Sequence, residues 1–210
     1  MSTARTAATA AAASQPVLAP PGAGIPRMER LIGGTIFAFR RWRGTPAGWT
    51  ALFQSERRAI DQLVQGSSPQ HLSMQVLIPR LRGLEDSSRN WSVWMTLDHL
   101  RIVNTQIAGV MQALLADRVP PGKASTAAVK PSPEATAAVL PAYHASCDAV
   151  ERAAGRAAAP SLRTRLRFAH PWFGPLDAAG WHAMAAMHMG IHKAQVRAIL
   201  LGARSSGATR

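Results

Sequence analysis

The chain has 210 residues, of which 47% are hydrophobic, and a formal net charge of +13. Its length predicts one globular domain, and because no apolar run reaches the roughly eighteen residues of a membrane span, we expect no membrane partner. The arginine clusters at 40–43, 57–58 and 163–167 lack the aromatic interleaving or helix-turn-helix pattern of nucleic-acid-binding proteins, so they favour a solvated basic surface, with nucleic-acid binding the weakest hypothesis.

Residues 1–27 form an Ala-, Thr- and Pro-rich segment without any acidic residue. We expect it to be a disordered tail, because it cannot bury enough apolar surface to offset the entropy of ordering. It lacks the leucine-rich core of a secretory signal, but its composition also fits a transit peptide or a misassigned start codon. We therefore expect a cytoplasmic protein with a single domain over 28–202 and a flexible tail at 203–210.

The apolar spacing of the first part of the domain predicts two helices. One covers 28–43 and ends at the Gly and Pro residues of 44–48, and the next covers 49–65 and ends before Gly66 and Pro69. A shorter apolar segment at 72–84 is interrupted by Pro79. These stops predict separate elements rather than one long helix.

Three further helices are predicted in the second part of the chain. The longest has Asn90 as its N-cap and runs to about Ala116, and a long polar connection then leads to a helix at 133–154. The last helix has Asp177 as its N-cap and runs to 201, with Gly202 in the left-handed C-terminal position. Because no alternating strand pattern is present, the sequence predicts an all-α four-helix bundle with a long crossover between its second and third main helices.

Two histidines of the last predicted helix share one face. His188 and His192 are four positions apart on the inward stripe, which allows both imidazoles to bind one divalent ion. His99 lies in the inward row of the longest helix, where a polar side chain is unfavourable unless something satisfies it. A single inward histidine is more often a hydrogen-bonded core residue, but three on facing helices predict a metal site that is open to water or substrate.

The single cysteine, Cys147, rules out an internal disulfide and a cysteine-based zinc cluster. It lies in the predicted helix 133–154 between small residues and without a basic residue next to it. We expect Cys147 to be a buried core residue rather than a nucleophile.

Three segments of the chain resemble the DinB-like, YfiT-like superfamily of bacterial four-helix bundles. They are W-S-V-W-M-T-L-D-H-L at 91–100, H-P-W-F-G-P-L at 170–176 and W-H-A-M-A-A-M-H-M-G-I-H-K-A-Q at 181–195. The resemblance covers roughly residues 49–202. It implies an up-down-down-up bundle, a divalent metal such as zinc or nickel held by His99, His188 and His192, and a homodimer. Characterised members of the superfamily include thiol-dependent transferases and isomerases.

Several neighbouring residues have predicted roles around this site. Gln195 either orients a ligand from the second shell or is a packing amide. Asp98 and His182 project away from the ligand direction, and we expect His182 at the surface or an interface. The residues expected to line a pocket without binding the metal are His144, His170, Trp172 and Phe173.

Two functions fit these residues. The leading hypothesis is a metal-dependent transferase or hydrolase, in which an external water or low-molecular-weight thiol attacks an electrophilic small molecule. The alternative is a non-catalytic, stress-associated binding or dimerisation module whose metal is structural or absent. The sequence shows no obvious general base.

Overall fold

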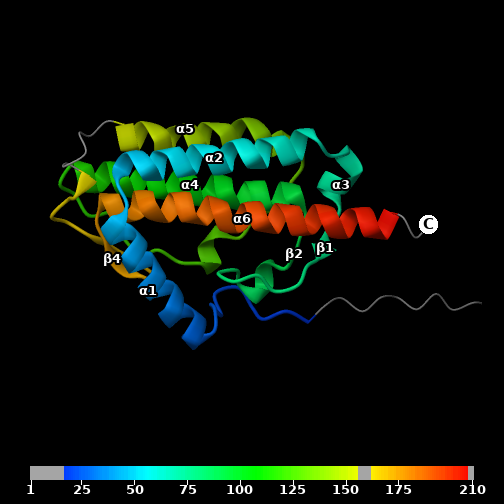
Figure 1. Ribbon diagram of the computed structural model, residues 1–210, viewed down its shortest axis with the longest axis horizontal. Coiled ribbons are helices and arrows are strands. Elements are labelled where there is room, and N and C mark those ends of the chain that lie inside the picture. Colours follow the sequence, from blue (N-terminus) through cyan, green and yellow to red (C-terminus); the bar gives the residue numbers. More distant parts are fainter. Residues whose placement is uncertain (1–16, 156–161, 208–210) are drawn as a thin grey trace, which may run out of the picture.

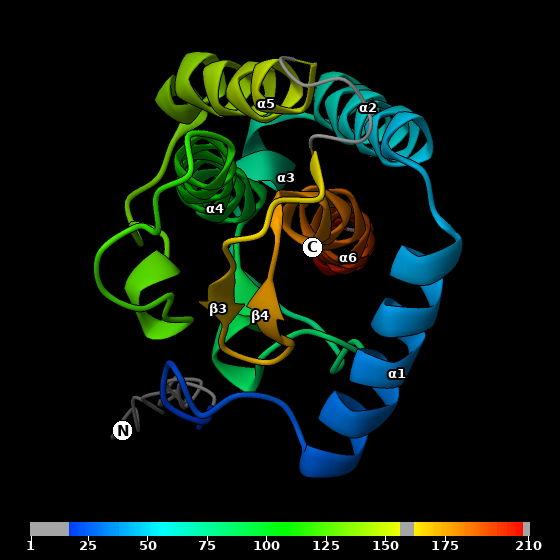
Figure 2. The same ribbon diagram turned by 90° about the vertical axis from the view of Figure 1, so that its left-hand side faces the viewer.

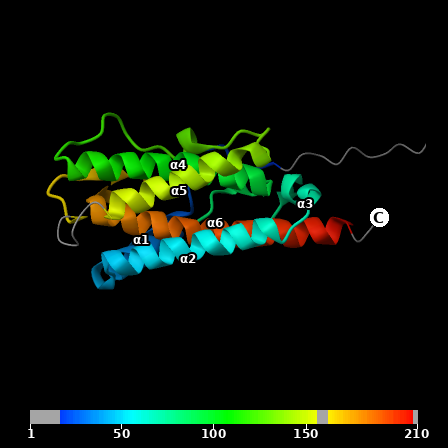
Figure 3. The same cartoon turned by 90° about the horizontal axis from the view of Figure 1, so that it is seen from above.

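The computed structural model describes residues 17–155 and 162–207, and four long helices form a bundle (Figure 1). These helices are α2 (Pro46–Gln65), α4 (Val93–Leu115), α5 (Leu140–Gly155) and α6 (Ala178–Gly207). In the bundle α4 packs against both α5 and α6, and α2 packs against α6 (Figures 1 and 3). The predicted four-helix bundle is confirmed at this level. Within the described part of the chain, no helix has the length and apolar character needed to cross a membrane.

Other elements surround the bundle. The helices α1 (Arg27–Arg43) and α3 (Pro69–Ser73) precede α4. Two antiparallel strand pairs, which the sequence analysis did not predict, join β1 (Val76–Leu77) to β2 (Asn90–Trp91) and β3 (Phe168–His170) to β4 (Gly174–Leu176). Strands of two or three residues are too short to show a period-2 pattern, so the prediction of no strands was wrong for a physical reason. Single 3₁₀ turns lie at Asp86–Ser88, Ala127–Val129 and Ala137–Val139.

The helix starts follow from local hydrogen bonds. Asp177 caps α6 as predicted, since its Oδ1 accepts a hydrogen bond from the Gly180 N–H at 2.8 Å. The cap of α4 is Ser92 instead of Asn90, because the Ser92 hydroxyl accepts from the Met95 N–H at 3.1 Å while Asn90 pairs in β2. The predicted starts therefore differ from the observed ones by only two residues or fewer in these two helices.

The predicted start of α5 at Pro133 was wrong. The Ser132 N–H donates to the Asp98 carboxylate on α4 at 2.9 Å, and the Glu134 N–H donates to the Ser132 hydroxyl at 3.2 Å. These bonds hold the Ser-Pro-Glu segment as a turn against α4, so that α5 begins only at Leu140. Tertiary hydrogen bonds here override a good local start signal.

The end of α6 also differs from its prediction. The helix continues past Gly202 to Gly207, into the segment that we expected to be a flexible tail. A Cβ atom on Gly202 would lie 2.5 Å from Cγ1 of Val76, so glycine allows β1 to approach the helix closely. The glycine is required by packing and is not a C-cap.

The bundle core is continuous and is reinforced by ion pairs between helices. Phe53, Leu97 and Tyr143 are among its fully buried side chains. The Arg57 guanidinium on α2 binds both Asp148 and Glu151 on α5, at 2.7 and 2.9 Å. These ion pairs join α2 to α5, while α4 and α6 pack directly against each other, which is the arrangement that the functional site requires.

The segment before the bundle covers one side of it (Figure 2). Residues 17–26, which we expected within the disordered tail, contact the loop before α4, where the Ala19 N–H donates to the Asp86 carboxylate at 2.8 Å. The rest of that expected tail lies outside the described residues. Helix α1 stands away from the four main helices, and its one buried side chain, Phe37, stacks on Phe173 with ring centroids 4.6 Å apart.

Candidate metal centre

The three predicted ligands meet inside the bundle. His99 comes from α4, and His188 and His192 lie one turn apart on α6. Nε2 of His188 is 3.3 Å from Nε2 of His99 and 3.0 Å from Nε2 of His192. One potential ligand atom from each ring lies within 4.8 Å of those of the others, so the three side chains can share one ion.

Hydrogen bonds to the outer nitrogens decide where the protons lie on two of these rings. Nδ1 of His99 donates to the Val129 carbonyl at 2.6 Å, because a carbonyl oxygen can only accept. Nδ1 of His192 lies 2.7 Å from Oε1 of Gln195, whose amide nitrogen donates to the Ser88 carbonyl at 2.7 Å. Gln195 therefore presents its oxygen, and Nδ1 of His192 carries the proton. Nε2 of His99 and Nε2 of His192 are both bare lone pairs.

The two lone pairs face a single nitrogen that cannot satisfy both. The neutral His188 ring has one N–H, so Nε2 of His188 can donate to at most one of them. Nδ1 of His188 is buried and has no hydrogen-bond partner among the described residues, so neither tautomer of that ring is satisfied. A cation between the three Nε2 atoms would use every lone pair. This is the donor set that a divalent transition metal requires.

Distance and charge state fit the same ion. Four-coordinate zinc with Zn–N bonds of about 2.0–2.1 Å would separate its nitrogen ligands by about 3.3–3.4 Å, close to the 3.0 and 3.3 Å observed here. Burial lowers the pKa of His99 to about 4 and holds the pKa values of His188 and His192 well below their ordinary value. All three rings are therefore neutral at pH 7 and available as ligands.

A large cavity opens beside the three histidines. Its volume is about 890 Å³, enough for a ligand of drug size. Its wall comes from α1, α4 and α6, the hairpin β3–β4 and loop residues within 82–88 and 120–130. His99, His188 and His192 form part of the same lining. The proposed metal position is therefore open to a small molecule. This agrees with the prediction that three histidine ligands leave the site open to water or substrate.

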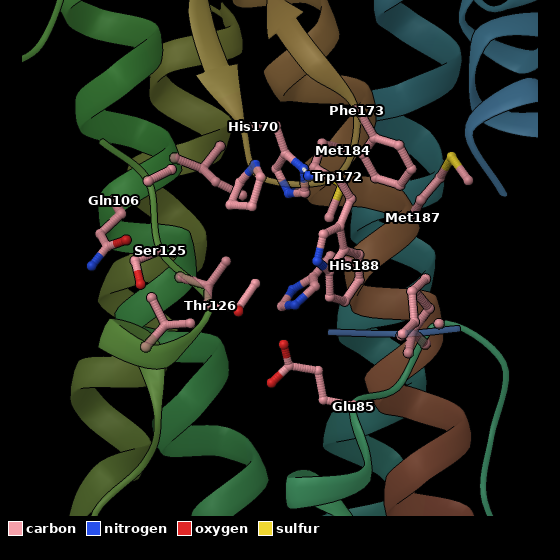
Figure 4. Close-up of a pocket in the computed structure, with 18 of the residues that line it drawn as sticks. Glu85, Gln106, Ser125, Thr126, His170, Trp172, Phe173, Met184, Met187 and His188 are labelled. Atoms are coloured by element: carbon pink, nitrogen blue, oxygen red, sulfur yellow. Dashed lines mark hydrogen bonds between the residues drawn. The ribbon is translucent and has the colours of Figure 1, made fainter. Parts of the chain in front are cut away.

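Glu85 is a charged residue of this cavity that the sequence analysis missed. Its side chain is buried, and the carboxylate points toward His188 in the close-up (Figure 4). Oε2 of Glu85 accepts a hydrogen bond from Lys130 at 2.8 Å, whereas the buried Oε1 has no partner among the described residues. Burial raises the pKa of Glu85, but the hydrogen bonds from Lys130 and Thr126 outweigh burial and bring the pKa below its ordinary value. Glu85 is thus an ionised carboxylate in the wall of the cavity.

No local sequence signal marks Glu85 as a site residue. It lies in an irregular segment before α4, and Lys130 lies in the connection between α4 and α5. Helical periodicity cannot place either residue, because their meeting depends on how two loops fold over the bundle.

The predicted pocket residues divide into two groups. His170, Trp172 and Phe173 line the cavity on the hairpin side (Figure 4). His144 is not among the described residues that line it; this side chain lies on α5 beside Tyr143, with ring centroids 5.2 Å apart. The predicted pocket therefore exists without its α5 member.

The prediction that His182 lies at the surface was wrong. His182 is buried, and its Nε2 lies 3.3 Å from the Thr50 hydroxyl on α2. The angular offset from His188 was right, but α2 packs on that second face of α6 and buries it. Asp98 avoids the metal centre as expected and pairs with Arg101 at 2.8 Å. Cys147 is confirmed as a core residue, and burial raises its thiol pKa to about 12.

Comparison with known proteins supports the fold and goes no further. No protein-family profile matches this chain, and no curated protein sequence matches it. A solved structure described as TT2238, a four-helix bundle protein, superposes with a TM-score of 0.54 and 21% sequence identity. The match covers 73% of this chain and 99% of that one. At this level of identity, the likeness shows that the two proteins share a four-helix bundle.

Proposed function

We propose that this protein is a divalent-metal-dependent transferase or hydrolase, in which water or an external thiol attacks an electrophilic small molecule with an apolar body. The observation that carries the proposal is the pair of bare Nε2 lone pairs on His99 and His192, which converge on His188 beside an open cavity. A purely structural core would pair these nitrogens with donors. The three imidazoles would hold zinc or nickel, and the cavity would hold the substrate.

A bound divalent ion would act as a Lewis acid that makes a water or thiol proton more acidic near neutral pH. The Glu85 carboxylate would accept this proton, since it is ionised and belongs to the wall of the same cavity. Lys130 keeps that carboxylate ionised and fixed in position. In the reaction, the nucleophile's S or O atom bonds to the electrophilic carbon, and the leaving group departs with its electron pair.

We propose more specifically that the protein belongs to the DinB-like superfamily. As the colours of Figure 1 show, the chain runs in one direction along α2 and α6 and in the opposite direction along α4 and α5. These directions support the up-down-down-up order. Residues 116–139 join α4 to α5 and would form the long crossover. We also propose a homodimer, on the strength of the resemblance.

Metal analysis tests the ion site directly. The purified full chain, dialysed against Zn²⁺ or Ni²⁺, should retain one ion per chain, and His188→Ala should lose it while keeping its helical circular dichroism. His71→Ala is the matched control, because His71 lies on α3 outside the cavity. A full chain that binds no divalent ion, or a His188→Ala variant that retains it, contradicts the site. Loss of the fold together with the ion would favour the non-catalytic alternative.

Activity is tested with metal-loaded protein and apolar electrophiles such as haloaromatics and aryl esters, with water, glutathione or bacillithiol as the nucleophile. Glu85→Gln should keep the ion but reduce turnover by about 100-fold or more, because the amide cannot accept the proton. If metal-loaded protein turns over none of the pairs, the transferase and hydrolase proposal loses to the binding-module alternative. If Glu85→Gln is fully active, the role of this carboxylate is refuted and the ion site is unaffected.

A further inference from the structure

Helix α1 presents a row of large apolar side chains to solvent. Met28, Leu31, Ile32, Ile36, Phe39 and Trp42 follow the three- and four-residue spacing of one helix face, and between 48% and 74% of each is exposed. Leu31 is 65% exposed and Trp42 is 74% exposed. A contiguous apolar face of this kind indicates an interaction surface for a protein, a membrane or a ligand.

Contacts on the other sides of α1 hold this face outward. Phe37 stacks on Phe173, and Arg41 pairs with Asp177 at 3.1 Å near the end of the helix. Near its start, Glu29 accepts a hydrogen bond from the Gly83 N–H at 2.6 Å. The helix is therefore anchored along its length while the apolar row stays uncovered.

The charges that border the row indicate the chemistry of the partner. Helix α1 contains five arginines and one glutamate, and that glutamate is already paired with Arg80. The arginines Arg27, Arg30, Arg40 and Arg43 are exposed, and the guanidinium of Arg43 lies 5.8 Å from the centroid of the Phe39 ring. Two copies of so basic a helix would repel each other, in a chain of net charge +13. An anionic surface complements this charge.

We propose that α1 lies flat on an anionic membrane surface, with its apolar row in the acyl region and its arginines at the lipid phosphates. A helix with Trp, Phe and Leu on one face and several arginines along its length has the composition of an interfacial helix. The earlier expectation of no membrane partner rested on the lack of a spanning segment, which does not exclude a helix on the surface. This inference does not depend on the metal centre.

The position of the cavity agrees with this orientation. Met28, Ile32 and Ile36 belong to the apolar row and also line the cavity beside the three histidines. A helix bound in this way would place the cavity mouth at the lipid surface. Apolar molecules dissolved in the membrane could then enter without crossing water.

Vesicle co-sedimentation of the full, metal-free chain tests the proposal. The protein should sediment with vesicles of equal parts phosphatidylglycerol and phosphatidylcholine and dissociate from them as the salt concentration rises. It should not bind vesicles of pure phosphatidylcholine. Leu31→Glu should weaken binding at least about tenfold by adding an anion to the buried face. Leu201→Glu is the matched control, because Leu201 is also 65% exposed but lies on α6; it should bind like the unchanged protein.

A second pair of variants tests the charge. The double change Arg27→Gln with Arg40→Gln should weaken binding by about 25-fold, at roughly fivefold for each arginine. The double change Arg118→Gln with Arg197→Gln removes two exposed arginines elsewhere and should have a smaller effect. The proposal is overturned if anionic vesicles do not bind the protein at low salt, or if Leu201→Glu is as damaging as Leu31→Glu. It is equally overturned if Leu31→Glu dissociates a dimer without changing vesicle binding, since a second copy of the chain would then cover the row.

Discussion

Gln195 allows the metal-site geometry to be tested without touching a ligand. Its side chain is fully buried and makes two hydrogen bonds of 2.7 Å, one with Nδ1 of His192 and one with the Ser88 carbonyl. The bond to His192 places the proton on Nδ1 of that ring. The bond to Ser88 prevents the Gln195 amide from flipping and exchanging its oxygen and nitrogen. We predict that Gln195→Leu weakens zinc binding by about 10- to 100-fold, because His192 loses the bond that orients its ring.

The same substitution should destabilise the metal-free protein. It leaves the His192 N–H and the Ser88 carbonyl without partners in the interior, at about 1–3 kcal/mol each, so the free energy of unfolding should fall by about 2–6 kcal/mol. The Gln195→Glu variant distinguishes the effects of the two hydrogen bonds. A carboxylate still accepts from His192 but cannot donate to Ser88, so this variant should keep most of its zinc affinity while losing stability.

The assays are a competition titration of zinc against a chromophoric chelator and urea unfolding followed by circular dichroism. Gln112→Leu is the control, since Gln112 is exposed on α4. If Gln195→Leu folds and binds zinc as tightly as the unchanged protein, the proton positions assigned to His192 are wrong.

Three further outcomes concern the rest of the fold. Burial lowers the pKa of His182 to about 4, so its contribution to stability is present above pH 6.5 and is lost as the pH falls toward 4. Between pH 7 and pH 4.5, the free energy of unfolding from urea titrations should therefore fall by up to about 2.5 kcal/mol less in His182→Gln than in the unchanged protein. An equal pH effect in both proteins would refute this. Cys147 should resist a thiol reagent such as dithionitrobenzoate until the protein is unfolded, and rapid labelling of the native protein would contradict its burial. Gly202→Ala should destabilise by about 1–3 kcal/mol through its clash with Val76, whereas Gly34→Ala, with open space around it, should be neutral or stabilising by up to about 1 kcal/mol in thermal unfolding.

Local hydrogen bonding explains which helix ends could be predicted. Asp177 was identified correctly because its cap is made within one turn of its own helix. The start of α5 was not, because Asp98 on a distant helix binds the backbone of Ser132. Gly202 was misassigned for a related reason, since Val76 and not the chain's own conformation requires a glycine there.

The amino-acid sequence by itself determined which side chains share a helix face. The 3.6-residue period places His188 and His192 together and turns His99 into the bundle, and this information is local to each helix. Tertiary packing alone decided which faces meet. It brought the three rings within reach of one ion, buried His182 under α2, and placed Glu85 in the cavity through loops that have no period of their own. It also left the apolar row of α1 uncovered, because packing against Phe173 used the opposite face.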